Sequence, residues 1–165
     1  MRMINYPKKE RIITMKDINA TGEFYTINHV TLITGLSERT VRSHIASGIL
    51  QGEKINGLWH FSPRQVEDFL SHPAVRPAIL TKNNTIVYDF LLDSKKSRPQ
   101  CCIILDMPGE DQKAVAEYFC YTISSGDFSD LRFSFDSVDG VPRVILRGHT
   151  DQVMELVKGY NTNSK

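Results

Sequence analysis

The stretch over residues 25–70 decides the fold, and it reads YTINHVTLITGLSERTVRSHIASGILQGEKINGLWHFSPRQVEDFL. Thr26 can cap a first helix, whose apolar residues recur at helical spacing. Gly35 follows where a helix end often needs a positive φ. Ser37 can cap a second helix over residues 38–47, and Gly48 stops it. The stretch therefore begins as helix, tight turn, helix.

A ribbon and a third helix are predicted next. Ile49 and Leu50 are expected to run out as a buried strand, and residues 51–57 form a ribbon that turns at Asn56-Gly57, a strong hairpin signal. Ser62, Pro63 and Gln65 then have the residue types of a capped helix start. The predicted order is therefore helix, turn, helix, wing and helix. This arrangement can place one helix in a DNA major groove with a ribbon beside it.

The second helix is expected to expose a polar face. Val41 and Ile45 are four residues apart and face inward, so polar side chains occupy the open side. We predict that the helix contacts DNA through Ser37, Arg39, Thr40, Arg42, Ser43 and His44, and that the ribbon does so through Lys54, Asn56 and His60.

These residues also carry a resemblance to a known class. The sequence TVRSH at residues 40–44, followed by GIL at 48–50, resembles the T-I-R-Y-Y…G-L-L pattern of the MerR family. The sequence GLWHF at 57–61 resembles the G-x-W-R-F wing end of excisionase-type domains. Ser43 and His44 replace the two MerR aromatics, and His60 stands in place of the usual wing Arg. The resemblance covers residues 24–70.

The resemblance implies a winged helix-turn-helix that binds double-stranded DNA. The function it implies is a MerR-like, sequence-specific transcriptional regulator acting as a homodimer, with an effector ligand that the sequence does not identify. The alternative is an excisionase-like recombination accessory or DNA-architectural protein. Such proteins are typically little more than this front domain, so the additional residues here favour the regulator.

The second half of the chain has a different pattern. Proline and apolar spacing predict a helix over residues 77–92, and the polar run 93–100 marks a boundary. Strands follow at 101–105, expected to be central in a sheet, and at 131–135, which turns at Asp139-Gly140 into a paired strand. Helices are expected over 110–125 and after a Thr150 cap. This βαββα order resembles a ferredoxin-like fragment with helices on one face of its sheet.

The predicted fold class is therefore α+β, in four segments. They are a basic N-terminal arm (1–23), a winged helix-turn-helix (24–72), a helical linker (73–100) and a dimerisation or sensing domain (101–161). Residues 1–100 hold 14 Lys or Arg and 9 Asp or Glu, whereas residues 101–165 hold 6 and 10. The front is thus basic and the back acidic, which suggests that only the front meets nucleic acid.

Composition argues against several other functions. No apolar run is long enough to span a bilayer, and the odd count of three cysteines favours a reducing cytoplasm over a disulfide framework. Adjacent cysteines on a strand point to opposite faces, so no metal site is expected. Asp106, Glu110 and Asp111 lack an accompanying nucleophile or phosphate loop. We therefore expect no enzyme, no cofactor and no membrane partner. The back half is expected to form the homodimer, through a sheet face carrying Leu131, Phe133 and Phe135 and through a second apolar surface, the stripe over residues 86–91.

Overall fold

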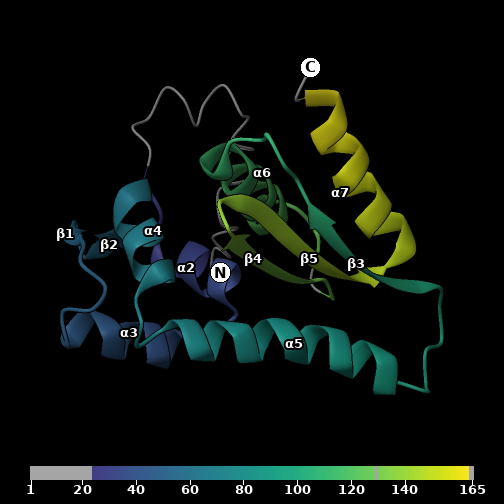
Figure 1. The fold of residues 1–165 in the computed structure, drawn as a ribbon, viewed down its shortest axis with the longest axis horizontal. Helices are drawn as coiled ribbons and strands as arrows, with labels where there is room; N and C mark the ends of the chain where they lie inside the picture. Colours follow the sequence, from purple (N-terminus) through teal and green to yellow (C-terminus); the bar gives the residue numbers. More distant parts are fainter. Residues whose placement is uncertain (1–23, 129, 164–165) are drawn as a thin grey trace, which may run out of the picture.

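The computed structural model describes residues 24–128 and 130–163. The arm predicted over residues 1–23 lies outside the described residues. In chain order the elements are α2 (Ile27–Thr34), α3 (Glu38–Ala46), β1 (Glu53–Ile55), β2 (Leu58–His60), α4 (Pro63–Ser71), α5 (Arg76–Leu92), β3 (Gln100–Asp106), α6 (Gln112–Ser125), β4 (Arg132–Val138), β5 (Val141–His149) and α7 (Thr150–Asn163) (Figure 1). Helices and two small antiparallel sheets confirm the α+β class.

The predicted caps define the front helices. The Thr26 hydroxyl accepts from the backbone N–H of His29, and α2 ends at Gly35 with a φ of 69°. A Cβ at Gly35 would lie 3.3 Å from the Cβ of Lys82 on α5, so glycine also permits close packing there. Ser37 caps α3, and Ser62 and Gln65 form the capping box of α4.

The chain after α3 differs from the prediction in one respect. Ile49 and Leu50 form a bend and not a strand. The backbone N–H of Leu50 donates to the carbonyl oxygen of His44 (3.1 Å), so the chain folds back on the helix end and has no strand partner there. Leu50 is nevertheless buried, at 1% exposure. The ribbon follows as predicted, with positive φ at both Asn56 and Gly57.

The larger sheet has the order β3-β5-β4, with both pairings antiparallel. The prediction that residues 101–105 form the central strand is therefore wrong, because β5 takes that place and β3 is an edge. β5 can be central although it carries two arginines, since both are neutralised. Arg143 binds Asp106 at 2.6 and 2.8 Å, and Arg147 lies 3.7 Å from Asp93.

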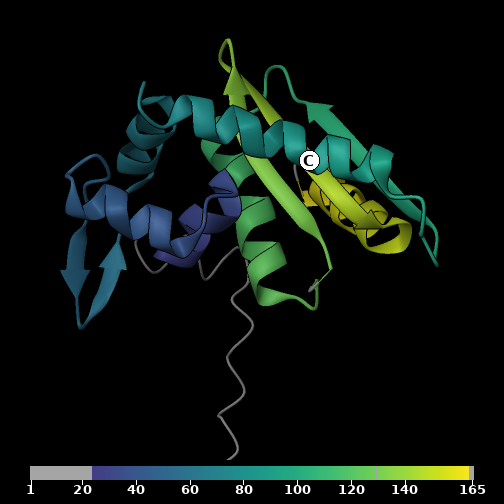
Figure 2. The same ribbon diagram turned by 90° about the horizontal axis from the view of Figure 1, so that it is seen from below.

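Helices cover both faces of this sheet, which corrects the expectation of one helical face. α6 and α7 pack on one face, whereas α5 lies across the other (Figure 2). The first face is apolar, and its Phe133 ring stacks 6.1 Å from Phe119 of α6. The expectation that Leu131, Phe133 and Phe135 form a dimer surface is also wrong, because they are 6%, 4% and 3% exposed and belong to the core.

The face under α5 is largely polar. Asp136 of β4 is 3% exposed and accepts from Arg76 at 2.5 and 3.3 Å and from the Asn83 amide at 3.4 Å. The side-chain oxygen of Asn83 accepts a hydrogen bond from the buried hydroxyl of Ser134. Buried polar groups are stable only when paired, so this cluster fixes the position of α5 on the sheet.

The core is continuous from the front helices to the sheet. α2 contacts α3 on one side and both β4 and α6 on the other. Tyr25 stacks on Tyr121 of α6, whose hydroxyl donates to the carbonyl oxygen of Phe24 (2.9 Å). One hydrophobic cluster therefore includes residues from α2 through α7. Within the described ranges, no helix has the length and apolarity needed to cross a membrane.

The last two helices begin close to the predicted positions. α6 starts at Gln112, two residues later than predicted, because Asp111 is the N-cap and accepts from the backbone N–H of Ala114 (2.8 Å). α7 begins at Thr150 itself, directly after β5. The carboxylate of Asp111 thus has a capping role, as the helix dipole favours.

Candidate nucleic-acid interface

The polar face of α3 is open, as the sequence predicts. Val41 is fully buried, while Arg39, Arg42 and Ser43 are exposed on the other side of the helix. α3 and the β1–β2 ribbon lie at one end of the molecule, and α7 lies at the other (Figures 1 and 2). The predicted helix and ribbon residues are therefore gathered on one end of the fold.

Arg42 is held by a neighbour on its own helix. Its Nε donates to Oε1 of Glu38 at 2.8 Å, and its Nη2 lies 2.6 Å from the same oxygen. More than half of each side chain is exposed, so this pair contributes little to stability. The carboxylate orients the guanidinium but would repel phosphate, and a nucleic acid must compete with it for Arg42. Sequence reasoning missed Glu38, although its spacing of four from Arg42 signals the pair.

The remaining predicted helix residues differ in accessibility. The Ser37 hydroxyl accepts from the backbone N–H of Thr40 (3.1 Å) and bonds its hydroxyl (2.8 Å), so both side chains are partly engaged in the cap. The ring of His44 packs edge-on against Phe69 of α4, with centroids 5.4 Å apart. His44 is thus only partly available, whereas Arg39 and Ser43 project freely.

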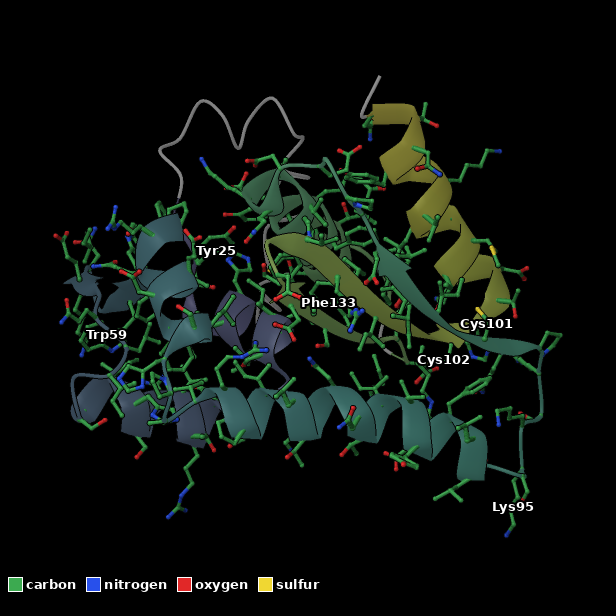
Figure 3. All side chains as sticks on the ribbon, in the orientation of Figure 1. Tyr25, Trp59, Lys95, Cys101, Cys102 and Phe133 are labelled. Carbon is green, nitrogen blue, oxygen red and sulfur yellow. The ribbon has the colours of Figure 1, made fainter. Side chains whose placement is uncertain are left out.

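The ribbon presents a mixed surface. Lys54 and Asn56 are exposed, and Asn56 also forms the turn. The ring of His60 stacks on Phe24 with centroids 3.8 Å apart, so it supports the base of the ribbon. Trp59 stacks on Phe61 at 6.2 Å and lies against the core, with its position labelled in Figure 3. Leu58 is 63% exposed near the turn, an apolar side chain on the ribbon surface that the prediction omitted.

The cysteines and the carboxylates near the start of α6 have structural surroundings in the described part of the chain. Among the described residues, no group of three His, Cys, Asp or Glu can hold a metal. Cys101 and Cys102 are neighbours on β3 and so point to opposite faces (Figure 3). Burial raises the pKa of the Cys120 thiol, which is enclosed in the core. The Glu110 carboxylate accepts from the Tyr160 hydroxyl (2.8 Å) and so has a structural partner.

An open cleft of about 1080 Å³ separates α4 from the start of α6 and from β4. Its charged lining includes Arg76 and Asp136, which bind each other. The whole lining holds five carboxylates and three basic side chains, so the cleft is net acidic and would repel nucleic acid. The α3 face and the ribbon are therefore the stronger candidate for a binding site.

No protein-family model, no curated protein and no solved structure matches this chain.

Proposed function

We propose that this chain is a cytoplasmic, sequence-specific transcriptional regulator that binds double-stranded DNA as a homodimer. The observation that carries the proposal is the open polar face of α3, with Arg39, Arg42 and Ser43, next to a two-stranded ribbon that exposes Lys54. A helix of this kind can enter the major groove while the ribbon meets the adjacent backbone. Capped helices on both sides make the presentation rigid.

The finer fold belongs to the same proposal. We assign residues 24–72 to a MerR-like winged helix-turn-helix and residues 101–161 to a ferredoxin-like fragment. The second assignment is supported by the strand order β3-β5-β4, in which β5 runs antiparallel between the two strands that α6 connects. Fold by itself carries no function, so the DNA-binding proposal depends on the α3 face.

Selection of genomic fragments by the purified protein tests the function. We expect enrichment of short inverted repeats near promoters. Enrichment of recombination attachment sites would instead support the accessory-protein alternative, which the GLWHF sequence at residues 57–61 favours. Absence of any enriched sequence at low salt would contradict DNA binding of either kind.

Arg42→Ala should lower affinity for the selected operator by about tenfold to hundredfold, because a bidentate Arg–guanine pair contributes about 1–3 kcal/mol. The thermal midpoint should change little, since Arg42 is exposed and pairs only with exposed Glu38. Fluorescence anisotropy with operator and scrambled duplexes measures both affinities. Arg132→Ala on β4 is the control, because it removes one exposed positive charge outside α3 and the ribbon. Equal losses in the two variants would overturn the assignment.

Lys54→Ala should weaken operator and scrambled DNA by the same factor. Lys54 is exposed on β1 and is expected to meet phosphate, which carries no sequence information. Loss of one phosphate contact should reduce the slope of log affinity against log salt by about 1. A titration from low to moderate salt measures this slope, and a selective loss on operator alone would show base contact instead.

A further inference from the structure

The outer edge of β3 is open. β3 pairs with β5 on one side, and among the described residues no strand lies on its other side. The opposite edge of the sheet differs, because α2 packs beside β4. An unpaired edge presents a row of backbone N–H and C=O groups that can template pairing with another chain.

β3 lacks the residues that usually prevent another strand from pairing at a sheet edge. Natural edge strands usually carry a lysine, a proline or a bulge that prevents pairing. β3 reads QCCIILD, with no proline and no charge before Asp106, and it pairs with β5 in unbroken register. Ile104 is 51% exposed on this strand. The edge is therefore flat, apolar and available.

Apolar side chains flank the edge under α5. Lys82 of α5 lies against Gly35 at the end of α2, so the flank of α5 that carries Leu80 is turned away from α2. Leu80 and Val87 are on this flank and line one hollow with Ile104. Leu91 continues the flank one turn later and is 71% exposed.

α7 carries a similar apolar flank, on the opposite face of the sheet from α5. Gly159 of α7 lies against Tyr118 of α6, because a Cβ there would be 2.4 Å from the Tyr118 hydroxyl. Met154 and Val157 are on the other side of α7, away from α6, and α7 contacts β3 and β5. Met154 is 49% exposed. A contiguous apolar band of this kind usually marks an interface.

The charges around β3 identify the partner as a second copy. Basic residues precede the strand at Lys95 and Arg98, and acidic residues follow it at Asp106 and Glu110. In an antiparallel self-pair, the basic start of one strand lies beside the acidic end of the other. Pairing centred on Cys102 brings Arg98, which precedes the strand, near Asp106 of the second copy, whose carboxylate also binds Arg143 of its own chain.

We propose that β3 pairs with β3 of a second copy across a two-fold axis, forming one continuous six-stranded sheet with three strands from each copy. The α5 flanks then meet on one face of the joined sheet and the α7 flanks on the other. This inference rests on the proposed function in one respect: a protein that binds inverted repeats must be a dimer, and the β3 pairing would form that dimer.

The joined sheet also sets the distance between the two α3 helices. α3 lies beyond the start of α5, whereas β3 lies beside the later half of α5 (Figure 1), and the proposed two-fold axis passes through β3. α5 has 17 residues, a length of about 25 Å at 1.5 Å per residue. The α3 helices are therefore separated by more than one DNA turn of about 34 Å. Half-sites about two turns apart are expected in the selected fragments.

The molecular mass of the full chain in solution tests the pairing. By light scattering at micromolar concentration, we expect twice the chain mass of 18.8 kDa for the wild type. Ile104→Lys and Leu91→Lys each place a charge in the interface and should shift the protein to 18.8 kDa. Leu58→Lys is the control, because Leu58 is 63% exposed but lies on the ribbon. A monomeric wild type, or variants that retain the doubled mass, would overturn the proposal.

Hydrogen exchange of the β3 amides separates strand pairing from a dimer held by helices alone. The outward amides of residues 100–106 should be protected in the wild type and exchange faster in Ile104→Lys, while β5 amides stay protected in both. A dimer whose β3 amides match those of the monomeric variant would refute the pairing. Anisotropy on a single half-site duplex is measured in parallel. A monomeric wild type that still binds the half-site would refute the pairing alone, whereas a dimeric wild type without DNA affinity would refute only the proposed function.

Discussion

Asp136→Ala should lower the free energy of unfolding by about 3–5 kcal/mol, the usual effect of removing one partner from a buried ion pair. Asp136 is 3% exposed and accepts from Arg76, from Asn83 and from the backbone N–H of Ser137 at 2.7 Å. Its loss leaves a guanidinium and an amide without their acceptor beneath α5. Urea denaturation of the full chain, followed by circular dichroism, measures the change.

The sheet itself provides a matched control for this prediction. Asp106 binds Arg143 through two hydrogen bonds of 2.6 and 2.8 Å, and it lies in the same cross-strand row as Asp136. Its carboxylate is solvent-exposed, so Asp106→Ala should have a much smaller effect. The double variant Arg76→Met with Asp136→Leu should recover much of the loss, because it removes both charges. Equal destabilisation by the two alanine variants would contradict the importance of burial.

Acidification should destabilise the protein between pH 6.5 and 4, chiefly through His29. Burial lowers the pKa of His29 to about 4, whereas an unfolded histidine has a pKa of about 6.5. Above pH 6.5 His29 is neutral in both the folded and the unfolded state, so its titration does not lower stability. As the pH falls, the unfolded chain binds the proton first, so stability decreases by an amount on the order of 3 kcal/mol and levels off below the folded pKa.

His29→Gln provides the comparison. Nδ1 of His29 accepts from the backbone N–H of Thr26 at 3.2 Å in a capping box, and glutamine at the same position can keep an acceptor without titrating. Denaturation at pH 7 and pH 4.5 should show a smaller loss for the variant than for the wild type. Identical losses would show that other groups cause the acid sensitivity.

Local signals made much of the front fold predictable. Thr26, Ser37 and Ser62 cap helices, and Asn56-Gly57 turns a ribbon, because each acts on backbone within a few residues. Exposure of Arg39, Arg42 and Lys54 follows from the same local periodicity. The partial burial of His44 and His60 does not, because their partners Phe69 and Phe24 come from other segments.

The position of each strand in the sheet was not predictable for the same reason. The apolar run in β3 is typical of a central strand, and the arginines of β5 are typical of an exposed one. Their actual order depends on distant carboxylates, since Asp106 neutralises Arg143 while Asp89 and Asp93 lie near Arg147. α5 also covers the second face through Asn83 and Arg76, which do not form part of an apolar stripe.

The shared packing of α2 has a consequence for folding during synthesis. α2 leaves the ribosome well before its partners in α6 and β4, which are made roughly 90 to 110 residues later. Until then Tyr25 lacks Tyr121, and the helix-turn-helix has only part of its hydrophobic surroundings. Contacts at such long sequence separation slow folding, because a large loop must close before they form. The segment that is proposed to read DNA therefore gains its full packing only after α6 and β4 have emerged.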